Sequence, residues 1–151
     1  MLDTLLTWLG LPPAYRTLLT VPAFTGDRVG AAGITPTHLS AWRSLLSSRH
    51  ATRHFRRLIA TGSLPAQLYG LAGLYYSDPA SVSLMAAPYI RSLESVPTLF
   101  ACFAGATPVR EIAEGIVTGA WPEALLRGQS YPPRYLPHMG GVGAPSGPGG
   151  V

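Results

Sequence analysis

Apolar residues recur at helical spacing on both sides of an Asp-Pro dipeptide within residues 63–93. On the first side they are three or four positions apart and comprise Leu64, Leu68, Leu71 and Tyr75. On the second side the same spacing links Val82, Met85, Tyr89 and Leu93. Each set lies on one face of a helix, so the pattern predicts two short helices joined by a tight turn, an αα-hairpin.

The predicted turn is formed by Asp78 and Pro79. Aspartate is a preferred N-cap, and proline at the first helical position gives up only an amide that would be unpaired in any case. We therefore expect the Asp78 side chain to cap the second helix. In the first helix we expect Leu71 to be buried and Gly73 to permit a close approach of the neighbouring helix.

The same periodicity predicts short helices before the hairpin. One is expected over residues 2–9, and a further turn or so over residues 15–19. A longer helix is expected to start at Thr35-Pro36. After an interruption at residues 47–50, another helix is expected to end at Gly62, because glycine is a natural C-terminal stop.

Beyond the hairpin the pattern is less uniform. Residues 95–106 are a nearly continuous apolar run, which is compatible with a buried strand and with a helix turned inward. A helix is expected to start at Thr107-Pro108 and to end near Gly119, and a last short one is expected from Trp121.

Three predicted helices share a start in which a capping residue precedes proline: Thr35-Pro36, Asp78-Pro79 and Thr107-Pro108. Together with tight turns and small residues at Gly70, Ala72 and Gly73, these starts resemble the HEAT-like class of α-helical hairpin repeats. The resemblance covers residues 36–93 and implies antiparallel helical hairpins.

The predicted fold class is all-α. Residues 1–127 are expected to form one small domain of short, Pro-capped antiparallel helices. Residues 128–151 are rich in proline, glycine and small residues and have almost no aliphatic periodicity, so we expect a disordered tail there.

Composition adds a weak preference for acidic partners. The 151 residues include eleven basic side chains, all of them arginine, and the formal net charge is +4. Only 12% of the residues are charged, so the overall field is weak. Without a long basic stripe or a known motif, we do not expect a nucleic-acid partner.

The densest charge cluster is the candidate anion-binding or partner-binding site, and it comprises Arg49, His50, Arg53, His54, Arg56 and Arg57. Guanidinium groups bind carboxylate and phosphate with two parallel hydrogen bonds. The alternative is a solvated helix face.

Four tyrosines are candidate contact aromatics, namely Tyr69, Tyr75, Tyr76 and Tyr89. The alternative for these is packing with the hydroxyls at the rim of the core.

No motif for catalysis, for a cofactor or for zinc is present in the sequence. The single cysteine, Cys102, lies among apolar residues and is expected to serve packing. We therefore expect a non-enzymatic helical domain that acts through contact with a protein partner, without a cofactor or a metal ion. The alternative is a small ligand-binding protein or enzyme whose site the sequence does not reveal.

Membrane association is a third hypothesis, because residues 58–77 carry no charge over the length that a bilayer core requires. Glycine, proline and polar residues interrupt this stretch, so a membrane span is not expected. The first ten residues lack the basic segment of a signal peptide, which favours a cytoplasmic location. The oligomeric state is left open.

Overall fold

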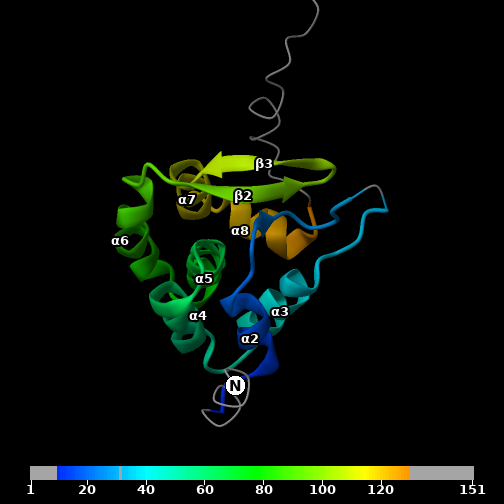
Figure 1. Cartoon of the computed structure of the whole chain (residues 1–151). Helices are drawn as coiled ribbons and strands as arrows, with labels where there is room; N and C mark the ends of the chain where they lie inside the picture. Colours follow the sequence, from blue (N-terminus) through cyan, green and yellow to red (C-terminus); the bar gives the residue numbers. More distant parts are fainter. Residues whose placement is uncertain (1–9, 31, 130–151) are drawn as a thin grey trace, which may run out of the picture.

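The computed structural model describes residues 10–30 and 32–129 (Figure 1). These residues form a mostly helical fold with a small sheet. The helices are α2 (Pro13–Leu19), α3 (Thr37–Leu46), α4 (Ala51–Thr61), α5 (Leu64–Ser77), α6 (Pro79–Ile90), α7 (Val109–Val117) and α8 (Ala120–Arg127). The strands are β1 (Phe24–Thr25), β2 (Ser95–Phe100) and β3 (Phe103–Pro108). The expectation of an all-α fold is therefore wrong for the strands and right for the rest of the described chain.

The sheet has the order β1-β2-β3, with β1 parallel to β2 and β2 antiparallel to β3. It lies across one end of the helices, above α7 and α8 in Figure 1. The apolar run of residues 95–106, which was compatible with a strand and with a helix, thus belongs to a β-hairpin. In β2, Val96, Thr98 and Phe100 are buried while Ser95 and Pro97 are exposed, which is the period of two that a strand requires.

Helix α5 is the central element of the fold, surrounded by the other helices (Figure 1). Residues on all sides of α5 are buried, and its composition is apolar all round, as expected for a helix without a solvent face. Leu71 lies in this helix and is fully buried, which confirms the prediction made for it.

The closest approach to α5 comes from α4. A Cβ atom added at Gly73 would overlap the ring of Phe55, and one added at Gly70 would lie 2.8 Å from the Phe55 carbonyl oxygen. The expected close approach at Gly73 is therefore confirmed. The neighbour is α4, which precedes α5 in the chain, and not the α6 partner of the predicted hairpin.

The turn between α5 and α6 differs from the prediction in one bond. Asp78 is the N-cap residue of α6, but its side chain accepts no hydrogen bond from the amides of that helix. Its Oδ2 atom instead accepts hydrogen bonds from Arg56 Nη2 at 2.6 Å and from Ser81 Oγ at 2.9 Å. The prediction of a side-chain cap is wrong because a guanidinium competes for the carboxylate more strongly than a backbone amide does.

The helix boundaries before the hairpin agree with the prediction. Helices α3 and α4 are separated at residues 47–50, and Gly62 follows the last residue of α4. The helix predicted over residues 2–9 and nearly all of the predicted tail lie outside the described residues. None of the described helices is both long enough and apolar enough to cross a membrane.

Candidate functional site

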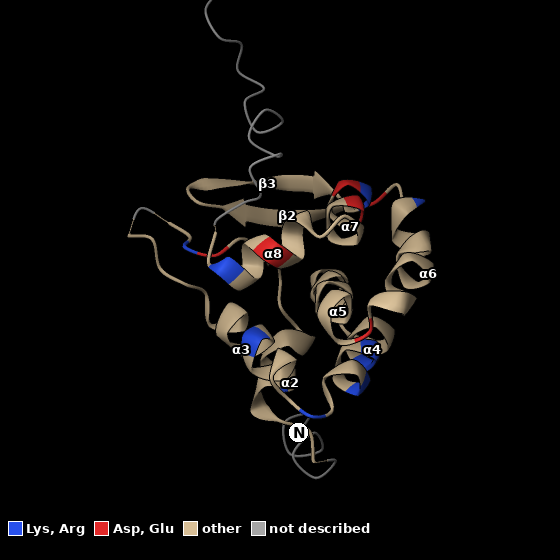
Figure 2. Ribbon diagram, turned by 180° about the vertical axis from the view of Figure 1, so that it is seen from behind, with Lys and Arg blue, Asp and Glu red and all other residues tan. Residues whose placement is uncertain are grey.

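The predicted basic cluster lies on α4 and on the turn before it, and Figure 2 shows the basic residues gathered on this helix. The turn is held by Ser48, whose hydroxyl accepts a hydrogen bond from the His50 amide at 3.2 Å. Arg49 lies in this turn, and Arg53 and Arg56 follow at spacings of four and three residues. Within α4, the spacing of three residues places Arg53 and Arg56 on one helix face.

A cleft of about 660 Å³ opens at this face. Its basic lining comprises Arg49, His50, Arg53 and Arg56, which are four of the six predicted residues. His54 and Arg57 are not part of the lining. The volume lies within the range of about 300–1,000 Å³ that is usual for ligand pockets.

Positive charge in the cleft exceeds negative charge. Arg56 forms an ion pair with Asp78 at 2.6 Å. Neither Arg49 nor Arg53 forms an ion pair with any other residue in the described part of the chain, and no carboxylate belongs to the cleft lining. Three guanidinium groups are therefore balanced by one carboxylate, which leaves two positive charges at the cleft without a partner.

The wall of the cleft also holds polar groups without acceptors. The amide of Ala51 donates to Ser48 O and that of His54 to His50 O, whereas the amides of Thr52 and Arg53 have no acceptor among the described residues. Ser77 of α5 also belongs to the lining, and its buried hydroxyl has no hydrogen-bond partner among the described residues. Unpaired amides at the start of a helix attract anions.

His54 does not add to the positive charge of this region at neutral pH. Partial burial lowers its pKa, and the nearby His50, Arg53 and Arg57 lower the pKa further. The imidazole ring of His54 faces the ring of Tyr15, at a centroid distance of 6.1 Å. The arginines of the cluster therefore carry positive charge at neutral pH, and His54 does not.

The four tyrosines predicted as contact aromatics differ in how far they are buried. Tyr69 is fully buried, because it lies on the helix that the others surround, so the prediction is wrong for this residue. Tyr75 and Tyr76 are partly buried and pack edge to face at 5.2 Å. Tyr89, also partly buried, donates a hydrogen bond to Gln67 Oε1 at 2.8 Å. Packing against the core accounts for these contacts.

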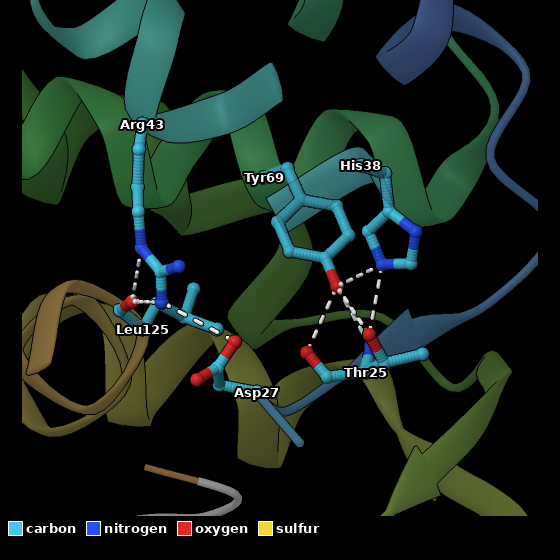
Figure 3. A network of polar contacts seen from close by, with 6 residues as sticks. All are labelled: Thr25, Asp27, His38, Arg43, Tyr69 and Leu125. Carbon is cyan, nitrogen blue, oxygen red and sulfur yellow. Dashed lines mark hydrogen bonds and ion pairs between the residues drawn. The ribbon is translucent and has the colours of Figure 1, made fainter. Parts of the chain in front are cut away.

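Tyr69 takes part in a polar network that the sequence did not indicate (Figure 3). The Thr25 amide donates to the Tyr69 hydroxyl at 2.8 Å, and that hydroxyl donates to the Thr25 carbonyl at 2.9 Å. His38 Nε2 lies 2.8 Å from Thr25 Oγ1 and 3.1 Å from the Tyr69 hydroxyl. Burial lowers the pKa of His38 to about 4 and raises the pKa of Tyr69.

A hydroxyl beside an imidazole is the arrangement that nucleophilic catalysis uses. Here the Thr25 side chain is buried, with 5% of the residue exposed, and the cleft lies elsewhere. A substrate has no access to this hydroxyl from the cleft. The network instead joins β1 to α3 and α5.

Arg43 makes a second connection of this kind, also shown in Figure 3. Its Nε and Nη2 atoms donate to the Leu125 carbonyl at 3.2 and 2.7 Å, and Nη2 lies 3.3 Å from Oδ1 of the buried Asp27. A cation at the C-terminal end of a helix is electrostatically favourable. Arg43 therefore fastens α8 to α3 and to the loop after β1. No sequence pattern links these positions, which are far apart along the chain.

Cys102 is exposed, so the expectation that it serves packing is wrong. It lies with Ala101 in the two-residue turn between β2 and β3. The apolar run around it forms a hairpin, and a hairpin places its turn at the surface.

The cleft at the start of α4 is suited to binding an anion. Guanidinium groups stay protonated at physiological pH, so they bind and orient charged ligands but do not transfer protons. The described residues contain no group of three or more His, Cys, Asp or Glu side chains that could hold a metal ion. Comparison of the chain with protein-family models, with curated proteins and with solved structures finds no match.

Proposed function

We propose that the protein is a non-enzymatic binding domain that takes an acidic segment of a partner protein into the cleft at the start of α4. The observation that carries the proposal is the excess of positive charge in this cleft, where Arg49 and Arg53 have no carboxylate partner among the described residues. Carboxylate groups of a partner would supply the hydrogen-bond acceptors that these guanidinium groups lack.

The lining of the cleft favours binding over catalysis. It holds three arginines and no carboxylate, and its one imidazole is that of His50. General acid–base chemistry usually needs a second positioned group to orient or assist the imidazole. A binding role requires only the charge and the shape that the cleft provides.

The helical framework supports an interaction role. Helices α4 and α5 are consecutive, are joined by a short turn and pack closely against each other, and a HEAT-like unit would need a hairpin of this kind. Stacked helical pairs present surfaces to partner proteins. The β-sheet is a departure from that class, so the proposal of a HEAT-like scaffold is limited to the helices α3 to α6.

A protein partner fits the distribution of exposed apolar side chains better than a membrane does. Binding at a lipid surface combines basic residues with neighbouring apolar residues that insert. The large exposed apolar residues of the described chain do not line the cleft, and they are Ile34, Leu84, Leu93, Phe103 and Leu126. The cleft thus offers charge without an inserting apolar edge.

The proposal is tested with a fluorescent peptide of eight glutamates, whose binding is followed by anisotropy at low and at moderate salt. The double variant Arg49→Gln/Arg53→Gln should bind at least about tenfold more weakly, about 1.4 kcal/mol. The matched control is Arg91→Gln/Arg110→Gln, which removes the same charge from exposed positions outside the cleft. Equal weakening by both variants, or no binding by the unmodified protein, would contradict the proposal.

A further inference from the structure

We infer that the group bound in the cleft at the start of α4 is a phosphate monoester on a side chain of the partner protein, such as phosphoserine. The inference rests on the proposed function, since it specifies the anion that the same cleft takes. It is carried by the charge balance of the cleft, by the arrangement of its donors and by its size.

The charge balance favours a dianion. Arg49 and Arg53 are unpaired among the described residues, and Arg56 is balanced by Asp78. A phosphate monoester carries a charge of about −1.5 to −2 at pH 7, whereas a carboxylate carries −1. One phosphate group therefore neutralises the cleft, and one carboxylate leaves it positive.

The donors of the cleft come from several places in the chain. Arg49 lies in the turn before α4, Arg53 lies in the first turn of α4, and the amides of Thr52 and Arg53 in that turn have no acceptor among the described residues. A phosphate monoester has three free oxygens in a tetrahedral arrangement, and a carboxylate has two oxygens in a plane. Several donors from different places in the chain are better satisfied by the tetrahedral group.

The size of the cleft indicates a phosphate attached to a larger chain. A volume of about 660 Å³ is much greater than a phosphate group occupies, so it leaves room for the side chain and backbone that carry the group. The apolar Leu46 and Ala51 also line the cleft and provide contacts for those parts. Lipid headgroups, nucleic acid and free phosphate share the phosphate chemistry, and the experiment separates them.

Because Arg56 forms an ion pair with Asp78, the inference also predicts a variant that binds a phosphorylated peptide more tightly than the unmodified protein does. Asp78 Oδ2 holds Arg56 Nη2 at 2.6 Å, and so it competes with a ligand for this guanidinium. The replacement Asp78→Asn removes the competing charge and leaves three unbalanced arginines at the cleft. We expect this variant to bind a phosphorylated peptide at least about threefold more tightly than the unmodified protein does.

The experiment uses three labelled pools of nine-residue peptides, randomised except for a central serine, glutamate or phosphoserine. Isothermal titration of the full chain should give binding of the phosphoserine pool at least about tenfold tighter than that of the glutamate pool. The variant Arg49→Gln/Arg53→Gln should abolish this preference, and Arg91→Gln/Arg110→Gln should keep it. Both arginines of the cleft variant are exposed, and a thermal unfolding scan checks that it folds.

The outcomes separate the inference from the proposed function. Equal affinity for glutamate and phosphoserine, both above serine, would overturn the phosphate inference and keep the acidic partner. No preference over serine would overturn both. Tighter binding of inorganic phosphate, of vesicles containing phosphatidylinositol phosphates or of single-stranded DNA than of the phosphoserine pool would overturn the assignment to a phosphorylated protein.

Discussion

The Tyr69 hydroxyl accepts a hydrogen bond from the Thr25 amide at 2.8 Å and donates one to the Thr25 carbonyl at 2.9 Å. A side chain of the central helix α5 thus satisfies both backbone groups of a strand residue. Strand β1 has only two residues, so these bonds make up much of its attachment to the helical layer. Buried backbone groups need such partners because water cannot reach them.

The replacement Tyr69→Phe should therefore be costly although it removes a single oxygen. It leaves the Thr25 amide and carbonyl buried without these partners, and we expect a loss of about 2–4 kcal/mol in the free energy of unfolding. Urea denaturation measures this loss. The control Tyr89→Phe removes the hydroxyl that donates to the partly exposed Gln67 and should cost about 1 kcal/mol. A smaller loss for Tyr69→Phe than for the control would show that the Thr25 bonds contribute little.

Stability should fall as the pH is lowered from about 6.5 to about 4. The pKa of His38 is lowered to about 4 in the folded protein, so between these values the unfolded chain binds a proton that the folded chain does not. The stability contributed by neutral His38 is complete above pH 6.5. We expect a loss on the order of 2 kcal/mol by pH 4, reduced from the full value because the ring is partly exposed.

Urea midpoints at pH 7.0, 5.5 and 4.0 measure this loss. The replacement His38→Gln should make the urea midpoint depend less steeply on pH. The control His50→Gln, at an exposed position, should leave this pH dependence as steep as in the unmodified protein. His54 contributes in the same direction, since its pKa is also lowered, so some slope should remain in His38→Gln. An unchanged slope in that variant would disprove the assignment to His38.

The replacement Gly73→Ala should destabilise the fold through contact with Phe55. The added methyl group would overlap the aromatic ring, and overpacking of this kind costs about 1–3 kcal/mol. Gly105→Ala is the matched control in β3, because no atom lies within 4 Å of the position of its added Cβ. Thermal unfolding should show a lower midpoint for Gly73→Ala and little change for the control. Similar midpoints for both variants would mean that α4 and α5 can separate without cost.

Leu71→Ala should cost more than Asp78→Ala. Leu71 is fully buried, so its truncation leaves a cavity and should lower the free energy of unfolding by about 2–5 kcal/mol. Asp78 makes a partly exposed ion pair and a bond to Ser81, and its loss should cost about 1 kcal/mol or less. Chemical denaturation of the two variants decides the order. A cost for Leu71→Ala near that of a surface change would contradict the central place of α5.

Local pattern determined the helices and the basic cluster of this protein. The burial of Leu71 and the helix ends at residues 47–50 and at Gly62 follow from spacing and from terminal residues a few positions apart. The gathering of Arg53 and Arg56 has the same origin, since residues three apart share a helix face, and Arg49 lies in the turn shortly before that helix. Interactions between near neighbours in the chain are encoded in any short stretch of sequence.

Contacts between distant residues were decided only by the tertiary structure. Asp78 bonds to Arg56, 22 positions away, and Tyr69 to Thr25, 44 positions away, so neither partner can be read from the neighbouring sequence. Residues 95–106 were compatible with strand and helix alike, and strand β2 also pairs with β1, which lies about seventy residues earlier in the chain. The closing of one side of the arginine cleft by Ser77 likewise depends on how α5 packs on α4. Which of several compatible partners a group takes is set by the packing of the whole chain, and a local pattern does not contain that information.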